Sequence, residues 1–196
     1  MSSMQAYLSA STYIDLDHPA VARQAATLGE SAASPLEVVQ RCFEFVRDEI
    51  KHSADHMLNP VTCKASDVLQ HRTGYCYAKS HLMAELLRAN GIPTGLCYQR
   101  LSVGDEGAPY CLHGLNAVYL NAFGWYRVDA RGNKPGVNAQ FTPPREALAF
   151  TLKDPMERDL PEIWAEPLPL VVQVLNACRD VGEVLCHLPD VPLLPA

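Results

Sequence analysis

The chain has 196 residues, of which 48% are hydrophobic and 19% are charged, a composition typical of a globular protein with a sizeable core. Its 16 basic and 22 acidic residues give a net charge of −6, which argues against a nucleic-acid partner because such proteins carry a basic patch. No stretch is apolar over the roughly 20 residues that are needed to cross a bilayer. We therefore expect neither a nucleic-acid nor a membrane partner.

The start of the chain has neither a basic segment nor a long apolar segment, so we expect no signal peptide and a cytoplasmic location. An odd number of cysteines at irregular spacings predicts free thiols rather than a disulfide framework in such a chain. We expect six of the seven to be small buried residues. The seven are Cys42, Cys63, Cys76, Cys97, Cys111, Cys178 and Cys186.

The N-terminal part of the chain is predicted to form a strand and two helices. Alternation of polar and apolar residues predicts a strand over residues 11–17, and a short helix is expected over 18–28. The clearest helix follows Ser34, which is a favourable N-cap, and Glu37 completes a capping box. Apolar residues then recur at helical spacing, so this helix is expected to run to about Lys51.

A second strong helix is predicted to begin at Cys76, because apolar residues recur after it at helical spacing and Asn90-Gly91 ends it. The pattern then changes to that of strands joined by turns. The other expected elements are a helical turn over 65–70, strands over 95–101, 114–120 and 125–130, a hairpin connection over 121–124, a loop over 131–144, a helical turn over 144–150 and a C-terminal helix over 169–180.

Cys76 follows a glycine-containing turn at the start of this second helix. Unpaired backbone N–H groups and the helix dipole favour an anion at such a position, and they lower the pKa of a thiol. A thiolate there is a nucleophile, and the same N–H groups can hold an oxyanion. Taken alone, however, the position favours a packed core cysteine over a nucleophile, so the partners of Cys76 matter.

Two possible partners lie on the predicted hairpin. His113 opens one arm, and Asp129 lies near the end of the other. Antiparallel neighbours can bring an imidazole and a carboxylate within hydrogen-bonding reach, which is what a thiol–imidazole–carboxylate arrangement requires. The sequence leaves the register open, because the loop length decides which side chains share a face. Taken separately, each residue is more simply explained as a strand or turn residue.

Three blocks of the sequence resemble the transglutaminase-like superfamily, in that family's order. Residues 74–79 and the helix after them resemble its nucleophile segment, 113–120 its histidine strand and 125–130 its aspartate strand. The resemblance covers about residues 65–132 directly. It implies a papain-like α+β fold of a small bacterial-type member, in which the nucleophile helix packs on an antiparallel β-sheet with extra N- and C-terminal helices.

The resemblance also carries expectations about organisation and chemistry. We expect a single domain over residues 1–196, with its core at about 34–150 and a C-terminal extension at about 151–196. The resemblance implies Cys76 as the nucleophile, His113 as general base and acid, and Asp129 as the carboxylate that orients the histidine.

The expected reaction is acyl transfer on an amide through a thioester at Cys76, with hydrolysis favoured over transfer to an amine. The expected substrate is a peptide, a protein or a small amide, and no cofactor is expected. One oxyanion donor would be the backbone N–H of Cys76, and Gln70 is a candidate for the second, although an amide at a helix end is more often solvated. Tyr75 and Tyr77 flank the nucleophile, so one could line the substrate cleft while the other packs. Lys79 is expected to be solvated.

Three alternatives stay open. The chain could be a transglutaminase-like binding module without turnover, or resemble the arylamine acetyltransferases, which use a similar set of residues. It could also bind metal, since His52, His56 and Cys63 would supply the three protein ligands of a catalytic zinc. No ligand-spacing motif is complete there, so we favour a polar loop at the rim of the cleft. Arg131 and Lys134 are either solvated loop charges or contacts for an acidic group of the substrate.

Overall fold

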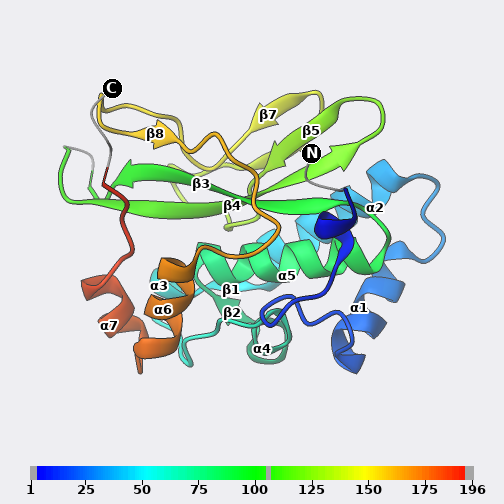
Figure 1. Ribbon diagram of the computed structural model, residues 1–196, viewed down its shortest axis with the longest axis horizontal. Coiled ribbons are helices and arrows are strands. Elements are labelled where there is room, and N and C mark those ends of the chain that lie inside the picture. Colours follow the sequence, from blue (N-terminus) through cyan, green and yellow to red (C-terminus); the bar gives the residue numbers. More distant parts are fainter. Residues whose placement is uncertain (1–3, 105–106, 193–196) are drawn as a thin grey trace.

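The computed structural model describes residues 4–104 and 107–192, and its elements are labelled in Figure 1. The helical elements are η1 (Met4–Leu8), α1 (Pro19–Gly29), α2 (Pro35–Glu44), η2 (Phe45–Glu49), α3 (Ser53–His56), α4 (Ala65–His71), α5 (Cys76–Ala89), α6 (Pro169–Ala177) and α7 (Val181–Cys186). The strands are β1 (Lys51–His52), β2 (Thr73–Gly74), β3 (Thr94–Ser102), β4 (Tyr110–Leu120), β5 (Gly124–Val128), β6 (Gln140–Thr142), β7 (Arg145–Ala147) and β8 (Arg158–Asp159).

The centre of the fold is a four-stranded antiparallel sheet with the strand order β5-β4-β3-β8. Helix α5 runs along one side of this sheet, and most of the other helices lie beyond α5 (Figure 1). All residues of α5 from Cys76 to Arg88 are buried, which makes it the central helix of the molecule. The predicted α+β class is therefore confirmed, with the helix that begins at Cys76 on an antiparallel sheet and further helices before and after it.

Helix α2 begins as predicted, with Ser34 as its N-cap. The Ser34 hydroxyl accepts a hydrogen bond from the backbone N–H of Glu37 at 3.3 Å, while the Glu37 carboxylate accepts one from Ala33 N at 2.8 Å. The helix continues as the π-helical turn η2 and stops before the predicted end, because Lys51 and His52 pair with strand β2 instead.

The predicted hairpin is present, but its first strand starts earlier than the predicted residue 114 and its second ends earlier than the predicted residue 130. Strand β4 begins at Tyr110, which pairs with Ser102 of β3, so His113 lies inside the strand rather than at its start. Strand β5 pairs with β4 only as far as Val128, so Asp129 follows the last paired residue. The extension of β4 arises from its pairing with β3, a tertiary contact that local sequence patterns do not contain.

Two predicted elements are wrong, and the loop predicted over 131–144 contains strand β6. Residues 11–17 form turns instead of a strand, because the Ser11 hydroxyl accepts from Ile14 N at 3.2 Å and competes with sheet pairing. Residues 144–150 contain strand β7 instead of a helical turn, and β7 pairs with β6. The Tyr126 hydroxyl donates to the Arg145 carbonyl at 3.0 Å and holds β7 next to β5.

The helix predicted over 169–180 ends early, and a further helix that was not predicted follows it. Helix α6 ends at Ala177, and Asp180 then caps a second helix, α7, by accepting from Glu183 N at 3.0 Å. The N-terminal segment and both C-terminal helices contribute to the same hydrophobic core as α5, through residues that include Ile14, Val171 and Val184. Within the part of the chain that the structure describes, no helix is long and apolar enough to cross a membrane.

All seven cysteines are free thiols, but they are less buried than predicted. Besides Cys76, only Cys42, Cys63 and Cys97 are buried; Cys111 and Cys178 are partly exposed, and Cys186 is exposed. Cys178 and Cys186 lie at the ends of the short C-terminal helices α6 and α7, each of which buries only one face.

Candidate active site

Cys76 is the first residue of α5, and a strand pair fixes the segment that leads to it. Strand β2 pairs in parallel with β1, with Gly74 opposite His52. A Cβ at Gly74 would lie 3.2 Å from the Thr62 hydroxyl and 3.3 Å from the Ala78 Cβ, so the tight approach to the helix favours glycine. No side chain caps the N-terminus of α5, which leaves its first N–H groups available to an anion at the Cys76 position.

His113 and Asp129 are brought together by the register of β4 and β5. Because Asn116 pairs with Val128, the same register places Asp129 opposite Leu115 and two residues from His113 on the same face. The His113 Nε2 lies 2.8 Å from the Asp129 Oδ2, and the Asp129 side chain is completely buried. The tertiary structure thus resolves the register that the sequence left open.

Backbone amides hold the Asp129 carboxylate in place. Its Oδ1 accepts from Arg131 N and its Oδ2 from Ala149 N, both at 3.1 Å. Burial raises the pKa of Asp129, but His113 and these hydrogen bonds outweigh it, and the pKa is lowered. Asp129 is therefore an anion aimed at the imidazole.

The Cys76 sulfur lies beside the His113 imidazole. Burial disfavours the charged ring, but the Asp129 carboxylate and the Cys76 sulfur outweigh it and raise the pKa of His113 to about 10. Since Nε2 contacts Asp129, Nδ1 is the nitrogen available to the thiol. The backbone N–H of Gly114 also donates to the Cys76 sulfur at 3.4 Å. This geometry suits proton exchange between a thiol and an imidazole, with a carboxylate that fixes the ring.

The side chains of Cys76 and His113 open onto a cavity of about 410 Å³. The Phe150 ring meets the His113 ring edge-on, with centroids 5.0 Å apart. Helix α7 contributes Leu185 to the apolar part of the wall, and the segment after it contributes Leu188. The cavity is thus assembled from segments that lie far apart in the sequence.

Of the other predicted site residues, two line the cavity and one does not. Tyr75 and Tyr77 both line the cavity, while their hydroxyls donate to the carbonyls of Val181 and Leu112, respectively. Gln70 does not enter the site: its side chain is exposed near the end of α4 and is absent from the cavity wall. The chain reverses through the left-handed residue that follows α4, so six residues of separation do not bring Gln70 to Cys76.

The structure does not assemble the candidate zinc ligands. His56 is exposed, and Cys63 is buried where its carbonyl contacts His81 Nδ1 at 2.7 Å. Over residues 4–104 and 107–192, no three His, Cys, Asp or Glu side chains are grouped so that they could hold a metal ion. His52 instead lines the cavity, and burial, together with nearby Arg131, lowers its pKa, so its ring is neutral.

We expected Lys79 to be solvated because it is charged, but the structure shows that it is fully buried. Its ammonium group donates to the carbonyl of Ile50, and burial lowers its pKa to about 7. The spacing contained a signal for this burial, because Lys79 lies three residues before Leu82 on the predicted apolar stripe of α5.

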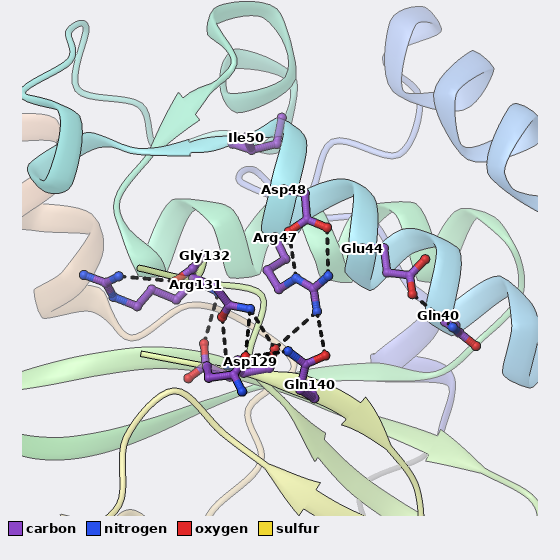
Figure 2. A network of polar contacts seen from close by, with 12 residues as sticks. Gln40, Glu44, Arg47, Asp48, Ile50, Asp129, Arg131, Gly132 and Gln140 are labelled. Carbon is purple, nitrogen blue, oxygen red and sulfur yellow. Dashed lines mark hydrogen bonds and ion pairs between the residues drawn. The ribbon is translucent and has the colours of Figure 1, made fainter. Parts of the chain in front are cut away.

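Arg47 lies in η2 and joins this turn to the loop after Asp129. It donates to the Ala139 carbonyl at 3.2 Å and to the Gln140 side chain at 3.3 Å, and it pairs with Asp48 (Figure 2). The π-helical turn η2 and the loop that carries Arg131 are thereby held next to each other. No local sequence pattern indicated this contact, which spans more than 90 positions.

Comparison with known proteins agrees with this architecture. Among solved structures, a candidate cysteine protease from Cytophaga hutchinsonii superposes with a TM-score of 0.53 and 19% identity, over 67% of this chain and 43% of that one. The periplasmic domain of TgpA from Pseudomonas aeruginosa gives a TM-score of 0.50 and 22% identity, over 65% of this chain and 46% of that one. This chain thus spans less than half the length of either relative, and the likeness concerns the fold.

No curated protein sequence matches this chain. The model of the transglutaminase-like superfamily, in contrast, matches residues 22–130, which is more than half of the chain. The matched segment contains Cys76 and His113, which line the cavity, and Asp129, which contacts His113. The chain belongs to the transglutaminase-like superfamily.

Proposed function

We propose that this protein is a cysteine-dependent amidase or peptidase, which transfers the acyl group of an amide to water through a thioester at Cys76. The observation that carries the proposal is the position of His113. Its ring lies between the buried Asp129 carboxylate, at 2.8 Å, and the Cys76 sulfur at the start of α5. The cavity beside them has room for a peptide side chain or a small amide.

In the first half of the reaction, the Cys76 thiolate attacks the amide carbonyl and forms a carbon–sulfur bond. The negative charge that develops on the carbonyl oxygen is stabilised by the free N–H groups in the first turn of α5. The His113 imidazolium then gives its proton to the amide nitrogen, the carbon–nitrogen bond breaks and an amine leaves. Asp129 keeps the imidazole oriented and balances its positive charge.

In the second half, His113 removes a proton from a water molecule that attacks the thioester. The carbon–sulfur bond breaks, a carboxylic acid leaves, and Cys76 is regenerated. If an amine took the place of water, the same residues would perform transamidation. We propose water as the acceptor and the cytoplasm as the location, and the acceptor is tested by identifying the product.

The first experiment compares thiol alkylation in the wild type and in His113→Ala, with the modified cysteine located by mass spectrometry. Cys186 is exposed and serves as an internal standard. We expect iodoacetamide to alkylate Cys76 in the wild type at least about tenfold faster than Cys186 at about pH 6, because an imidazolium partner stabilises the thiolate. His113→Ala should lose this advantage.

If Cys76 reacts no faster than Cys186 in either protein, the site has no activated thiol, and the alternative of a binding module without turnover replaces this proposal. If Cys76 is reactive, a series of chromogenic amides is tested against the wild type and Cys76→Ser. Turnover that disappears in Cys76→Ser, with a free acid as the product, is the expected result.

A further inference from the structure

Two cations in the cavity wall share a single carboxylate. Arg131 Nη1 lies 2.7 Å from the Asp55 Oδ2, and Lys134 Nζ lies 2.6 Å from the Asp55 Oδ1. Both cations line the cavity, whereas Asp55 does not. Hydrogen bonds from Arg131 and Lys134 overcome the effect of partial burial and lower the pKa of Asp55 to about 2, so the carboxylate stays ionised. The group of three has one positive charge in excess.

Arg131 is fixed, whereas Lys134 is accessible. Only 7% of the Arg131 side chain is exposed, and its guanidinium also donates to the Gly132 carbonyl at 3.3 Å (Figure 2). The guanidinium lies over the Phe150 ring. In contrast, 43% of the Lys134 side chain is exposed, and its ammonium group has the single partner Asp55 among the described residues. An incoming anion can therefore contact Lys134 while Arg131 and Asp55 keep the wall in place.

Glu157 also lines the cavity, but it does not cancel this charge, because Lys153 lines the cavity as well. The Glu157 carboxylate accepts from the backbone N–H groups of Ser102 at 3.0 Å, Lys153 at 2.5 Å and Asp154 at 3.1 Å, which hold it in place. The positive excess at Arg131 and Lys134 stands out because the chain as a whole carries a net charge of −6.

We propose that the Arg131–Lys134 wall binds a carboxylate of the substrate, so that the enzyme acts on amides that carry an acidic group. This inference rests on the proposed function, since it names the substrate class of the same cavity. Arg131 closely follows Asp129 in the chain, and its backbone N–H donates to the Asp129 carboxylate, so the wall and the catalytic carboxylate share one loop. An acidic group on the wall would therefore hold the scissile amide at a defined position next to Cys76.

The proposal is tested with alkylating probes that differ only in charge. Bromoacetyl derivatives of glycine, β-alanine and γ-aminobutyrate carry a carboxylate at increasing distance from the reactive carbon, and their N-methylamides are the neutral controls. The Cys76 sulfur displaces bromide in each case. The measured quantity is the ratio of the rate constants for acid and amide at Cys76, divided by the same ratio at the exposed Cys186.

For at least one spacer length, we expect this normalised ratio to be about threefold or more in the wild type, and to fall when the salt concentration is raised to about 0.5 M. Lys134→Gln should reduce the ratio towards one, while Lys134→Arg should retain it. Lys64→Gln is the matched control: it removes the same charge from an exposed position that does not line the cavity, and it should retain the wild-type ratio.

The two proposals fail in different ways. If the neutral probes label Cys76 rapidly but the normalised ratio is near one for every spacer, the proposed function stands and the acidic-substrate inference is wrong. The inference is equally wrong if Lys134→Gln and Lys64→Gln give the same ratio, because Asp55 then only fastens the loop to α3. If no probe labels Cys76 faster than Cys186, both proposals fall.

Discussion

At the scale of single residues, Asp129 shows how a buried carboxylate is kept ionised and oriented towards its partner. Its carboxylate contacts His113 and the backbone N–H groups of Arg131 and Ala149, which come from three different segments. A buried carboxylate without such partners would be protonated. Here the contacts keep it ionised, and its charge outweighs the burial that would otherwise keep His113 neutral.

Asp129→Asn tests this coupling, because it keeps the size of the side chain and removes the charge. We expect the pKa of His113 to fall from about 10, since only the Cys76 sulfur then opposes the effect of burial. Alkylation of Cys76 at about pH 7 should slow by at least about tenfold. The rate is measured across pH for this variant, the wild type and the surface control Asp17→Asn. Equal rates in all three proteins would contradict the role of the carboxylate.

The same pair makes stability depend on pH. Because the pKa of folded His113, about 10, lies above its unfolded value of about 6.5, the pair contributes stability that is present below about pH 6.5 and lost as the pH rises through about 10. In Asp129→Asn, the free energy of unfolding should decrease less than in the wild type as the pH rises towards about 10. Urea unfolding at several pH values measures this difference.

At the scale of elements, the site depends on the close approach of β4 to the start of α5. A Cβ at Gly114 would lie 3.0 Å from the Tyr77 Cα and 3.2 Å from the Tyr77 N. These are backbone atoms of the helix, so they cannot rotate away as the end of a side chain can. Glycine at this position therefore lets the strand that carries His113 reach the helix that carries Cys76.

Gly114→Ala should separate these two elements. We expect the free energy of unfolding to fall by about 1–3 kcal/mol from overpacking, and alkylation of Cys76 to slow because His113 and the thiol move apart. The stability control is Gly104→Ala, whose added Cβ would have nothing within 4 Å. Both variants are compared with the wild type by urea unfolding. If the two variants have the same stability, the packing argument is wrong.

At the scale of the whole molecule, α5 passes through the middle of the core and carries ionisable side chains with it. Glu85 is fully buried on this helix, and burial, together with nearby Asp15, raises its pKa to about 9. Asp15 belongs to the N-terminal segment and accepts hydrogen bonds from Ser66 at the start of α4. The N-terminal segment, α4 and α5 thus meet at one group of polar side chains.

Glu85→Gln should stabilise the protein in a pH-dependent way. A carboxyl whose folded pKa lies above its unfolded value of about 4.3 contributes stability below that pH, and this contribution is lost as the pH rises through about 9. Glutamine does not titrate. The free energy of unfolding of the variant should therefore exceed that of the wild type only slightly at about pH 4, and by on the order of 1–3 kcal/mol at about pH 8.

Urea unfolding at several pH values measures this difference, with Glu49→Gln at an exposed position as the matched control. A difference between Glu85→Gln and the wild type that does not change with pH would show that Glu85 is not protonated in the folded protein.

The sequence alone determined the parts of this protein that depend on neighbours in the chain. The cap at Ser34, the start of α5 at Cys76 and its end at Asn90-Gly91 follow from short patterns, and the structure confirms them. The resemblance of three blocks also identified the family and the fold class, which the match over residues 22–130 confirms. The expectation of one domain, with its core at 34–150, stays a prediction.

Tertiary structure decided the rest, because side chains that are distant in sequence meet only when strands and helices pack. The register of β4 and β5 placed His113 next to Asp129, and chain reversal after α4 turned Gln70 away from Cys76. Burial reversed the expectation for Lys79, whose charge suggested solvent. The cavity wall that we propose for substrate carboxylates lies after the matched segment, on a loop whose position depends on long-range polar contacts such as those of Arg47. Such contacts have no periodicity, and for this reason no pattern in the sequence could predict them.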